Sequence, residues 1–304
     1  MRCAILLCLL VTLLPALDAR AAVLVYQRRG SRDIVAAYAT GSHARVIARG
    51  EAPVVSPDGR RVVFIKSRRS SLDLYVVSTK GGRARLLARD AVLLSEPPSD
   101  VWSPDNRHVV AGDLTGYGGF VLDVIRRTRR TVSLESDFGG GSFSPSGKQF
   151  AMVDAQPRRA DVYLFASDGS HQRHLAVGNF PVWGRRGIAF TAANAVVLKA
   201  APRKHARTLL RPAPPDSALP IAWSADGNAL LAAQGQSFDS LSAVVIDPRT
   251  GATQSPPGTF SSVDGLSRDG SSILAETGGN VVTVRSDGEQ RVVARAATTA
   301  SWTR

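Results

Sequence analysis

The chain has 304 residues, a formal net charge of +13 and two cysteines. Both cysteines, Cys3 and Cys8, lie in an N-terminal apolar segment, so disulfide bonds and thiol chemistry are excluded from the rest of the chain. The positive charge comes mainly from arginine and favours acidic partners, although arginine-rich usage can equally follow from the base composition of a genome.

The first predicted element is a secretory signal peptide over residues 1–21. Arg2 supplies positive charge, residues 4–17 form an apolar run, and residues 19–21 have the small-x-small form of a cleavage site. We expect cleavage between Ala21 and Ala22 and export to the periplasm or the medium. The alternative is a retained N-terminal anchor, which the shortness of the apolar run disfavours.

Residues 22–304 are predicted to form one repeat array. All four tryptophans end a short stretch of apolar or small residues, and three other residues hold the same position before a Ser-x-x-Gly turn. These seven anchors are Val55, Trp102, Phe143, Trp183, Trp223, Leu266 and Trp302. They are separated by 47, 41, 40, 40, 43 and 36 residues. A period near 40 indicates an array of similar supersecondary units.

Each unit reads as four short strands. In the unit after Val55, the turn Ser56-Pro57-Asp58-Gly59 is followed by apolar runs over 61–65 and 72–77, a glycine turn, and a short strand over 84–88. Turn residues every 8 to 12 positions between β-branched runs predict an all-β protein. The same phrases recur in the later units, and the Pro-rich stretch 202–220 is predicted to be an outer strand plus a loop.

The two ends of the array complement each other. The chain after the signal begins with the strand phrase 23–26, and the array ends at the anchor Trp302. If the ring closes, the strand of Trp302 completes the N-terminal sheet and leaves no unpaired edge there. Seven anchors therefore predict a seven-bladed β-propeller of four-stranded blades, with six blades as the alternative.

The phrase APVVSPDGRRVVFIKS and its echoes at Ser103, Ser144, Ser224 and Ser267 resemble the WD40-like (PD40) repeats of the TolB-type β-propeller family. The resemblance covers residues 22–302 and implies the fold, with little information on function. TolB itself has an additional N-terminal α/β domain and six blades. Here the strands begin directly after the signal and seven phrases are present, so the partnership of TolB with its own binding proteins does not carry over.

Two sets of repeated residues have both a structural and a functional interpretation. The anchor tryptophans could stack on a ligand, but inner-strand aromatics are expected to pack between adjacent sheets. The aspartates of the turns could form a ring of carboxylates, but a Pro/Gly turn favours hydrogen bonds to the backbone of the turn itself. We therefore predict structural roles for Trp102, Trp183, Trp223, Trp302, Asp58, Asp105, Asp226 and Asp269.

Catalytic and metal-binding signals are weak. Of the five histidines, only His171 and His174 have metal-like spacing, and no third ligand lies beside them in the sequence. The chain has no G-x-S-x-G elbow, no H-E-x-x-H motif and no phosphate loop. The sequence therefore predicts no catalytic site, no metal and no cofactor.

Arginine clusters are the strongest candidate for binding. In a four-stranded blade, the turn after the first strand and the turn after the third strand share one face of the disc. The candidate binding residues for an anionic partner on this face are Arg126, Arg127, Arg129, Arg130, Arg185 and Arg186. A solvated charged surface is the alternative. Nucleic acid is disfavoured as the partner because these clusters lack interleaved aromatic residues.

These observations predict an exported, non-enzymatic interaction module with no transmembrane segment after cleavage, which we expect to be a monomer. Its partner would be a protein or an anionic envelope polymer, because a rigid ring presents loops from many blades. The alternative is a carbohydrate-active lyase or hydrolase with a site in the central channel. Convergent His, Asp, Glu or Arg side chains in the channel would favour that alternative.

Overall fold

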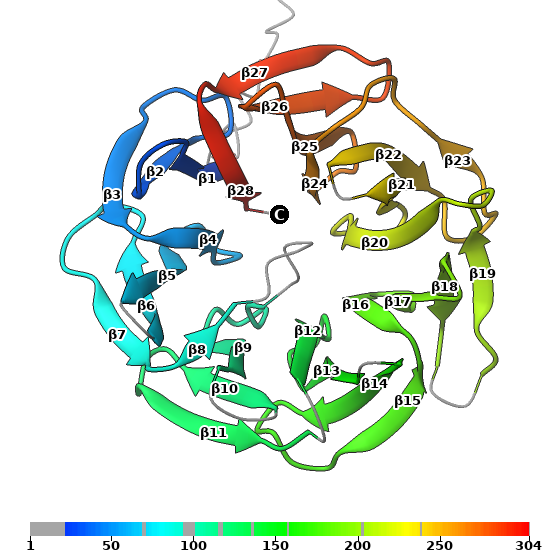
Figure 1. Ribbon diagram of the computed structural model, residues 1–304, viewed down its shortest axis with the longest axis horizontal. Helices are drawn as coiled ribbons and strands as arrows, with labels where there is room; N and C mark the ends of the chain where they lie inside the picture. Colours follow the sequence, from blue (N-terminus) through cyan, green and yellow to red (C-terminus); the bar gives the residue numbers. More distant parts are fainter. Residues whose placement is uncertain are drawn as a thin grey trace, which may run out of the picture.

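In the computed structural model, seven four-stranded antiparallel sheets form a closed ring, and we call the region that their innermost strands surround the central channel (Figure 1). The structure describes residues 22–68, 71–93, 101–114, 118–134, 137–156, 158–201, 204–237 and 239–303. The predicted seven-bladed β-propeller is confirmed, and the six-bladed alternative is wrong. Within these ranges there is no helix, and so none that could span a membrane. The predicted signal peptide, residues 1–21, lies outside them.

Blades are numbered in chain order, and each is given from its innermost strand outward. Blade 1 contains β28 (Ala297–Trp302), β1 (Val23–Arg28), β2 (Asp33–Tyr38) and β3 (Arg45–Arg49). Blade 2 contains β4 (Glu51–Val55), β5 (Arg61–Arg68), β6 (Ser71–Ser78) and β7 (Arg85–Ala88). Blade 3 contains β8 (Ala91–Val92), β9 (His108–Asp113), β10 (Gly119–Asp123) and β11 (Thr128–Val132). Blade 4 contains β12 (Asp137–Phe143), β13 (Gln149–Gln156), β14 (Arg159–Ala166) and β15 (Arg173–Val177).

The remaining blades repeat this order. Blade 5 contains β16 (Asn179–Gly184), β17 (Gly187–Ala192), β18 (Ala195–Lys199) and β19 (Arg207–Leu210). Blade 6 contains β20 (Ser217–Trp223), β21 (Leu230–Ser237), β22 (Ser240–Ile246) and β23 (Thr253–Gln254). Blade 7 contains β24 (Ser262–Leu266), β25 (Ser272–Thr277), β26 (Asn280–Arg285) and β27 (Gln290–Ala294). The predicted outer strand in the Pro-rich stretch is β19.

The hydrophobic core is divided among the interfaces between blades. Each of the seven hydrophobic clusters combines side chains from two neighbouring blades, and each of the seven interfaces has one cluster. The middle strands carry continuous apolar runs because both of their faces are covered, as at Val62–Ile65 of β5. The ring is therefore held together by the packing of sheet against sheet.

Three of the anchor tryptophans are buried at these interfaces. The Nε1 of Trp102 donates to the carbonyl oxygen of Val54 at 3.1 Å, and the Nε1 of Trp223 donates to that of Val182 at 3.0 Å. In both pairs the acceptor lies on the innermost strand of the preceding blade. Trp302 is also buried, whereas Trp183 is half-buried. The buried rings thus pack between blades, and two of them also bridge blades by a hydrogen bond.

The aspartates of the repeated turns bond within their own turns. The Ser224 hydroxyl donates to the Asp226 carboxylate at 2.7 Å, and the same carboxylate accepts the backbone N–H of Asn228 at 2.9 Å. These bonds lower the pKa of Asp226 to about 2. The equivalent serine-to-aspartate bonds occur at Asp58, Asp105 and Asp269. Each carboxylate stabilises the turn that precedes the second strand of its blade.

The last strand closes the ring. β28 lies beside β1 (Figure 1) and pairs with it antiparallel. In this pairing Leu24 lies opposite Trp302. The Ser301 hydroxyl accepts the backbone N–H of Val55 at 3.0 Å and donates to the carbonyl oxygen of Pro53 at 3.2 Å. The C-terminal strand therefore completes blade 1 and is bonded to the innermost strand of blade 2.

Gly184 gives a direct test of this close packing. A Cβ added there would lie 2.3 Å from the Trp223 ring, whereas one added at Gly265 would lie 3.1 Å from the Nε1 of Trp302. We expect Gly184→Ala to lower the free energy of unfolding by about 1–3 kcal/mol, because a rigid ring must move, and Gly265→Ala to lower it by less. Urea unfolding of both variants measures the difference, and equal losses would contradict the proposed contact with Trp223.

Candidate functional sites

The two ends of the channel lie on two faces with different chemistry. We use "arginine face" for the face with the turns β4–β5, β6–β7 and β10–β11, and "channel face" for the opposite face, which carries turns such as β25–β26. Antiparallel pairing within each blade places the turns after the first and third strands on the same face, as the sequence predicts. Two cavities with charged side chains, one on each face, are candidate sites.

The cavity on the arginine face is a groove of about 1160 Å³ between blades 2 and 3. Five arginines line it: Arg60, Arg61, Arg83, Arg85 and Arg127. No carboxylate is among the described residues of its lining. Arg83, Arg85 and Arg127 are exposed and close to an exposed apolar side chain, Ile125, which is 57% accessible. The groove thus combines positive charge with a small apolar area.

The six arginines predicted from sequence do not form one site. Arg126 to Arg130 belong to blade 3, whereas Arg185 and Arg186 belong to blade 5, with blade 4 between them. Of the six, only Arg127 lines the groove between blades 2 and 3. The Arg129 guanidinium lies 4.9 Å from the centre of the Phe120 ring, within reach of a cation–π interaction.

Several arginines have a structural role between blades. Arg130 forms an ion pair of 2.8 Å with Asp168 of the next blade, and Arg186 donates to the carbonyl oxygen of Gly227 at 2.8 Å. Arg61 donates to the carbonyl oxygen of Asn106 at 3.1 Å. A planar guanidinium with five donors is suited to such carbonyl contacts. Part of the arginine excess therefore connects neighbouring blades.

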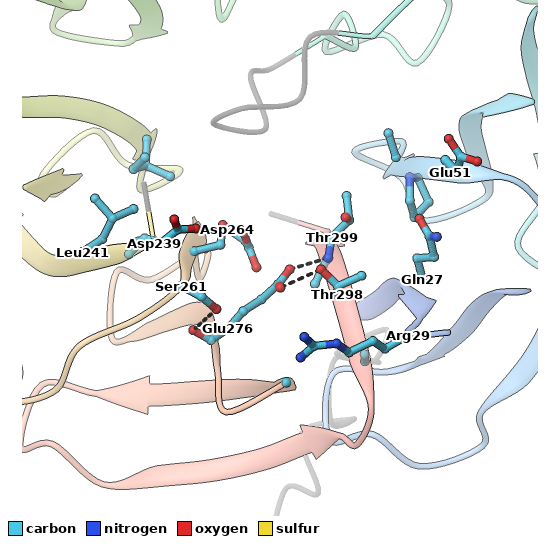
Figure 2. Close-up of a pocket in the computed structure, with 18 of the residues that line it drawn as sticks. Gln27, Arg29, Glu51, Asp239, Leu241, Ser261, Asp264, Glu276, Thr298 and Thr299 are labelled. Carbon is cyan, nitrogen blue, oxygen red and sulfur yellow. Dashed lines mark hydrogen bonds between the residues drawn. The ribbon is translucent and has the colours of Figure 1, made fainter. Parts of the chain in front are cut away.

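The cavity on the channel face has a volume of about 860 Å³ (Figure 2). Its lining contains four carboxyl side chains and one guanidinium: Glu51, Asp239, Asp264, Glu276 and Arg29. Figure 2 shows Asp264 and Glu276 directed toward one another, with Arg29 on the side of β1. This group was not predicted from the sequence, because its members come from blades 1, 2, 6 and 7.

Glu276 connects blade 7 to the closing strand. Its Oε2 accepts the Thr298 hydroxyl at 2.8 Å, and its Oε1 accepts the backbone N–H of Thr299 (Figure 2). Thr299 has a φ of 50°, a left-handed conformation that is uncommon for a residue with a branched side chain. The carboxylate thus accepts a hydrogen bond from the backbone N–H of Thr299, at the point where β28 departs from regular pairing with β1. Burial nevertheless raises the pKa of Glu276, against the lowering effects of these bonds and of Arg29.

Asp264 lies at an irregularity of β24, where the pairing with β25 shifts register between Val263 and Gly265. Such a bulge redirects a side chain relative to the regular alternation of the strand. One oxygen accepts the Ser262 hydroxyl at 2.5 Å, whereas the other, Oδ2, is buried and has no hydrogen-bond partner. Burial, with the neighbouring Glu276 charge as a second cause, raises the pKa of Asp264 well above its usual range.

This raised pKa predicts a dependence of stability on pH. A carboxyl group with a higher pKa in the folded state has its full stabilising effect below the pKa of the unfolded state, about 4, and loses it as pH rises through the folded value. We expect Asp264→Asn to increase the free energy of unfolding at pH 7–8 by about 1–3 kcal/mol, because it removes a buried group that resists ionisation. The gain should disappear near pH 4. Urea unfolding across this range provides the test, and a gain that is independent of pH would contradict it.

The histidines do not converge. The Nε2 of His174 lies 2.7 Å from the Asp161 carboxylate, and the Nδ1 of His171 lies 2.7 Å from the Ser170 hydroxyl, both on blade 4. Within the described ranges, no group of three or more His, Cys, Asp and Glu side chains is arranged to hold a metal ion.

Solved structures similar to this chain are β-propeller proteins. TolB from Acinetobacter baumannii has a TM-score of 0.60 at 15% identity, over 93% of this chain and 66% of TolB. An oligogalacturonate lyase in complex with manganese has a TM-score of 0.63 at 14% identity, over 89% of this chain and 83% of the lyase. A Mycobacterium tuberculosis puromycin-hydrolyzing peptidase has a TM-score of 0.66 at 17% identity, over 88% of this chain and 49% of the peptidase.

These likenesses establish the class of protein as a β-propeller, TolB-like in its fold. The chain spans less than two thirds of TolB and about half of the peptidase. No protein-family model and no curated protein sequence matches the chain. At identities of 17% or less the likeness concerns the fold alone.

Proposed function

We propose that this protein is an exported, non-enzymatic β-propeller that binds an anionic partner through the groove between blades 2 and 3. The observation that carries this proposal is the lining of the groove, with five arginines and no carboxylate among its described residues. Exposed guanidinium groups bind carboxylates or phosphates in a bidentate manner, and Ile125 adds apolar contact. Either an acidic protein surface or an anionic envelope polymer meets these requirements.

The binding residues in the groove differ from the six arginines predicted from the sequence. Arg83, Arg85 and Arg127 form its centre, because they line the groove and are exposed. Arg126 and Arg129, beside Arg127 on blade 3, extend the positive surface, whereas Arg185 on blade 5 is separated from it by blade 4. Arg130 and Arg186 are better assigned to the contacts between blades described above.

The test replaces Arg83, Arg85 and Arg127 together by Gln and measures binding to polygalacturonate and to poly-glutamate. We expect affinity to fall about 10- to 100-fold, on the basis of roughly 0.5–1 kcal/mol for each charged contact. The remaining binding should depend less on salt, because fewer charges are screened. The control replaces Arg173, Arg291 and Arg295, which are exposed, lie outside the groove and carry the same charge. Equal losses of affinity in both triple variants would show that only net charge matters, and would contradict binding in the groove.

The proposed export has its own measurement. Mass spectrometry of the protein recovered from the culture medium or the periplasm should give a chain that begins at Ala22. A recovered chain that still begins at Met1 would contradict cleavage of the signal.

The carbohydrate-active alternative is favoured by one observation, the carboxyl pair Asp264 and Glu276 in the channel. Glycoside hydrolases use two carboxyl groups in different environments. We place this alternative second, because both oxygens of Glu276 bond to the closing strand and the side chain of Asp264 is buried. A general acid must reach the substrate. Hydrolysis or cleavage of an oligosaccharide by the native protein, and its loss in Glu276→Gln, would reverse this order.

A further inference from the structure

The cavity on the channel face has the opposite charge to the protein as a whole. The chain carries a formal net charge of +13, yet the cavity has four carboxyl side chains and only one guanidinium. Glu51 is partly neutralised by Arg32 at 3.3 Å, whereas Asp239 is exposed at the opening. A local field of this sign attracts a cation even when the whole molecule repels it.

An independent feature indicates where such a cation would be held. Asp264 is 5% exposed and lines the cavity, and its buried Oδ2 has no hydrogen-bond partner. Buried carboxylate oxygens normally accept at least one hydrogen bond. Glu276, toward which Asp264 is directed in Figure 2, already has a donor on each oxygen. Asp264 therefore contributes an acceptor whose donor is missing.

The rest of the lining suits an alkyl chain. Pro53, Val54, Leu219, Ile221 and Leu241 contribute to the wall of the cavity. An apolar wall next to carboxyl groups is complementary to a ligand with a hydrocarbon stem and a positively charged end. We propose that this cavity binds the primary ammonium group of an alkylamine, with Asp264 and Glu276 as its counter-charges and the apolar wall around its stem.

The number of free acceptors distinguishes between cations. A guanidinium is best recognised by a carboxylate with both oxygens available, but one oxygen of Asp264 already accepts the Ser262 hydroxyl. Divalent metals usually take three or more protein ligands or several waters. An ammonium group is compact, and one of its three N–H donors is enough to satisfy Oδ2. Binding at Oδ2 requires the Asp264 carboxylate to turn toward the cavity, because this oxygen is buried in the unliganded structure.

Binding of the ammonium group displaces a proton from Asp264 and is opposed by the positive charge of Arg29. The raised pKa of Asp264 means that the carboxyl carries a proton over part of the pH range, and this proton passes to the solvent when the ammonium group takes its place. The charged groups that face the site are Glu276, Glu51, Asp239 and Arg29. Arg29 opposes the ligand, and its guanidinium lies against Gly279 at the edge of the cavity. Affinity should therefore increase with pH and with the removal of Arg29.

The experiment is isothermal titration calorimetry of the purified protein with 1,5-diaminopentane and with the capped peptide acetyl-Gly-Lys-Gly-amide. Stronger binding of the diamine would identify a free amine as the ligand, and stronger binding of the peptide a lysine of a partner protein; either result supports the proposal. Titration in two buffers with different ionisation enthalpies detects the released proton. Mono-acetylated 1,5-diaminopentane tests whether one ammonium group is enough, and the diacetylated compound is the uncharged control.

Variants then locate the site. We expect Asp264→Asn and Glu276→Gln to weaken binding about tenfold or more, and Arg29→Met to strengthen it about threefold, as single charges at short range in a partly buried site. Asp287→Asn and Glu289→Gln, both exposed on the β26–β27 turn, should leave it unchanged. If Glu276→Gln fails to fold, Asp264→Asn and Arg29→Met still provide a test, because they should change the affinity for the amine in opposite directions. The proposal would be overturned if neither amine bound, or if the diacetylated compound bound equally well. It would also be overturned if millimolar Mg²⁺ or Ca²⁺ displaced the amine, or if Asp264→Asn left amine binding unaffected.

This inference does not depend on the proposed function. The two cavities lie on opposite faces, so Arg83, Arg85 and Arg127→Gln should leave amine binding unchanged, and Asp264→Asn should leave binding to polygalacturonate unchanged. Failure of one site is thereby distinguished from failure of the other.

Discussion

Deletion of residues 296–304 is expected to unfold the whole propeller rather than fray one blade. The deletion removes β28, so the first blade loses its innermost strand and β1 becomes an unpaired edge at the channel. Ala297, Ala300 and Trp302 are all buried there. Loss of the Trp302 side chain alone would cost about 3–5 kcal/mol, a large part of the 5–15 kcal/mol that stabilises a typical protein.

The polar contacts of β28 increase the expected effect. Glu276 would lose the donors Thr298 and Thr299, and the backbone N–H of Val55 would lose the Ser301 hydroxyl. Each hydrogen bond lost in this way costs about 0.5–1.5 kcal/mol net, because the uncovered groups can then bond to water. The damage therefore reaches blades 7 and 2 on both sides of the gap.

Circular dichroism and differential scanning calorimetry measure this prediction. We expect no cooperative unfolding transition, or a melting temperature lowered by more than about 10 °C, since roughly 1 kcal/mol corresponds to about 2–4 °C in domains of about 150–250 residues. A synthetic peptide of residues 295–304 added to the truncated protein should restore part of the loss. A truncated chain that melts like the intact protein would refute closure by β28.

The fold was predictable because its signals repeat. Seven anchors at nearly constant spacing, each before a turn and two apolar runs, define a unit, and a repeated unit reveals its own boundaries. The complementary ends then specified how the ring closes, and the observed pairing of Leu24 with Trp302 agrees with this. An error in predicting any one strand matters little, because the six other units carry the same pattern.

The candidate sites were less predictable because they break the pattern. Asp264 and Glu276 lie on adjacent strands of blade 7, but the bulge between Val263 and Gly265 decides the direction of Asp264, and a bulge has no clear sequence signature. Thr298 and Thr299 reach Glu276 only because the ring closes. The arginine clusters were visible, yet sequence alone did not separate those that bond to the next blade from those that line the groove.

The tryptophans give the second large prediction, because their environments differ although their repeat position is the same. Trp102 and Trp223 are buried and donate to a carbonyl oxygen of the preceding blade. We expect Trp102→Ala and Trp223→Ala to lower the free energy of unfolding by about 3–5 kcal/mol each. Trp183 is half-buried, so Trp183→Ala should cost clearly less. Equal losses at all of these positions would contradict the assigned packing.

Replacement by Phe separates the ring from its hydrogen bond. Trp102→Phe and Trp223→Phe leave a buried carbonyl oxygen without its donor, which adds about 1–3 kcal/mol to the loss of volume. The Nε1 of Trp302 is buried and has no hydrogen-bond partner, so Trp302→Phe removes an unpaired donor and should cost less than the other two by a similar amount. Urea unfolding of the three Phe variants decides this. If Trp302→Phe were the most damaging of the three, Nε1 would have a partner in solution, and the backbone carbonyls of β24 beside Gly265 would be the first place to look, because a Cβ at Gly265 would lie only 3.1 Å from that nitrogen.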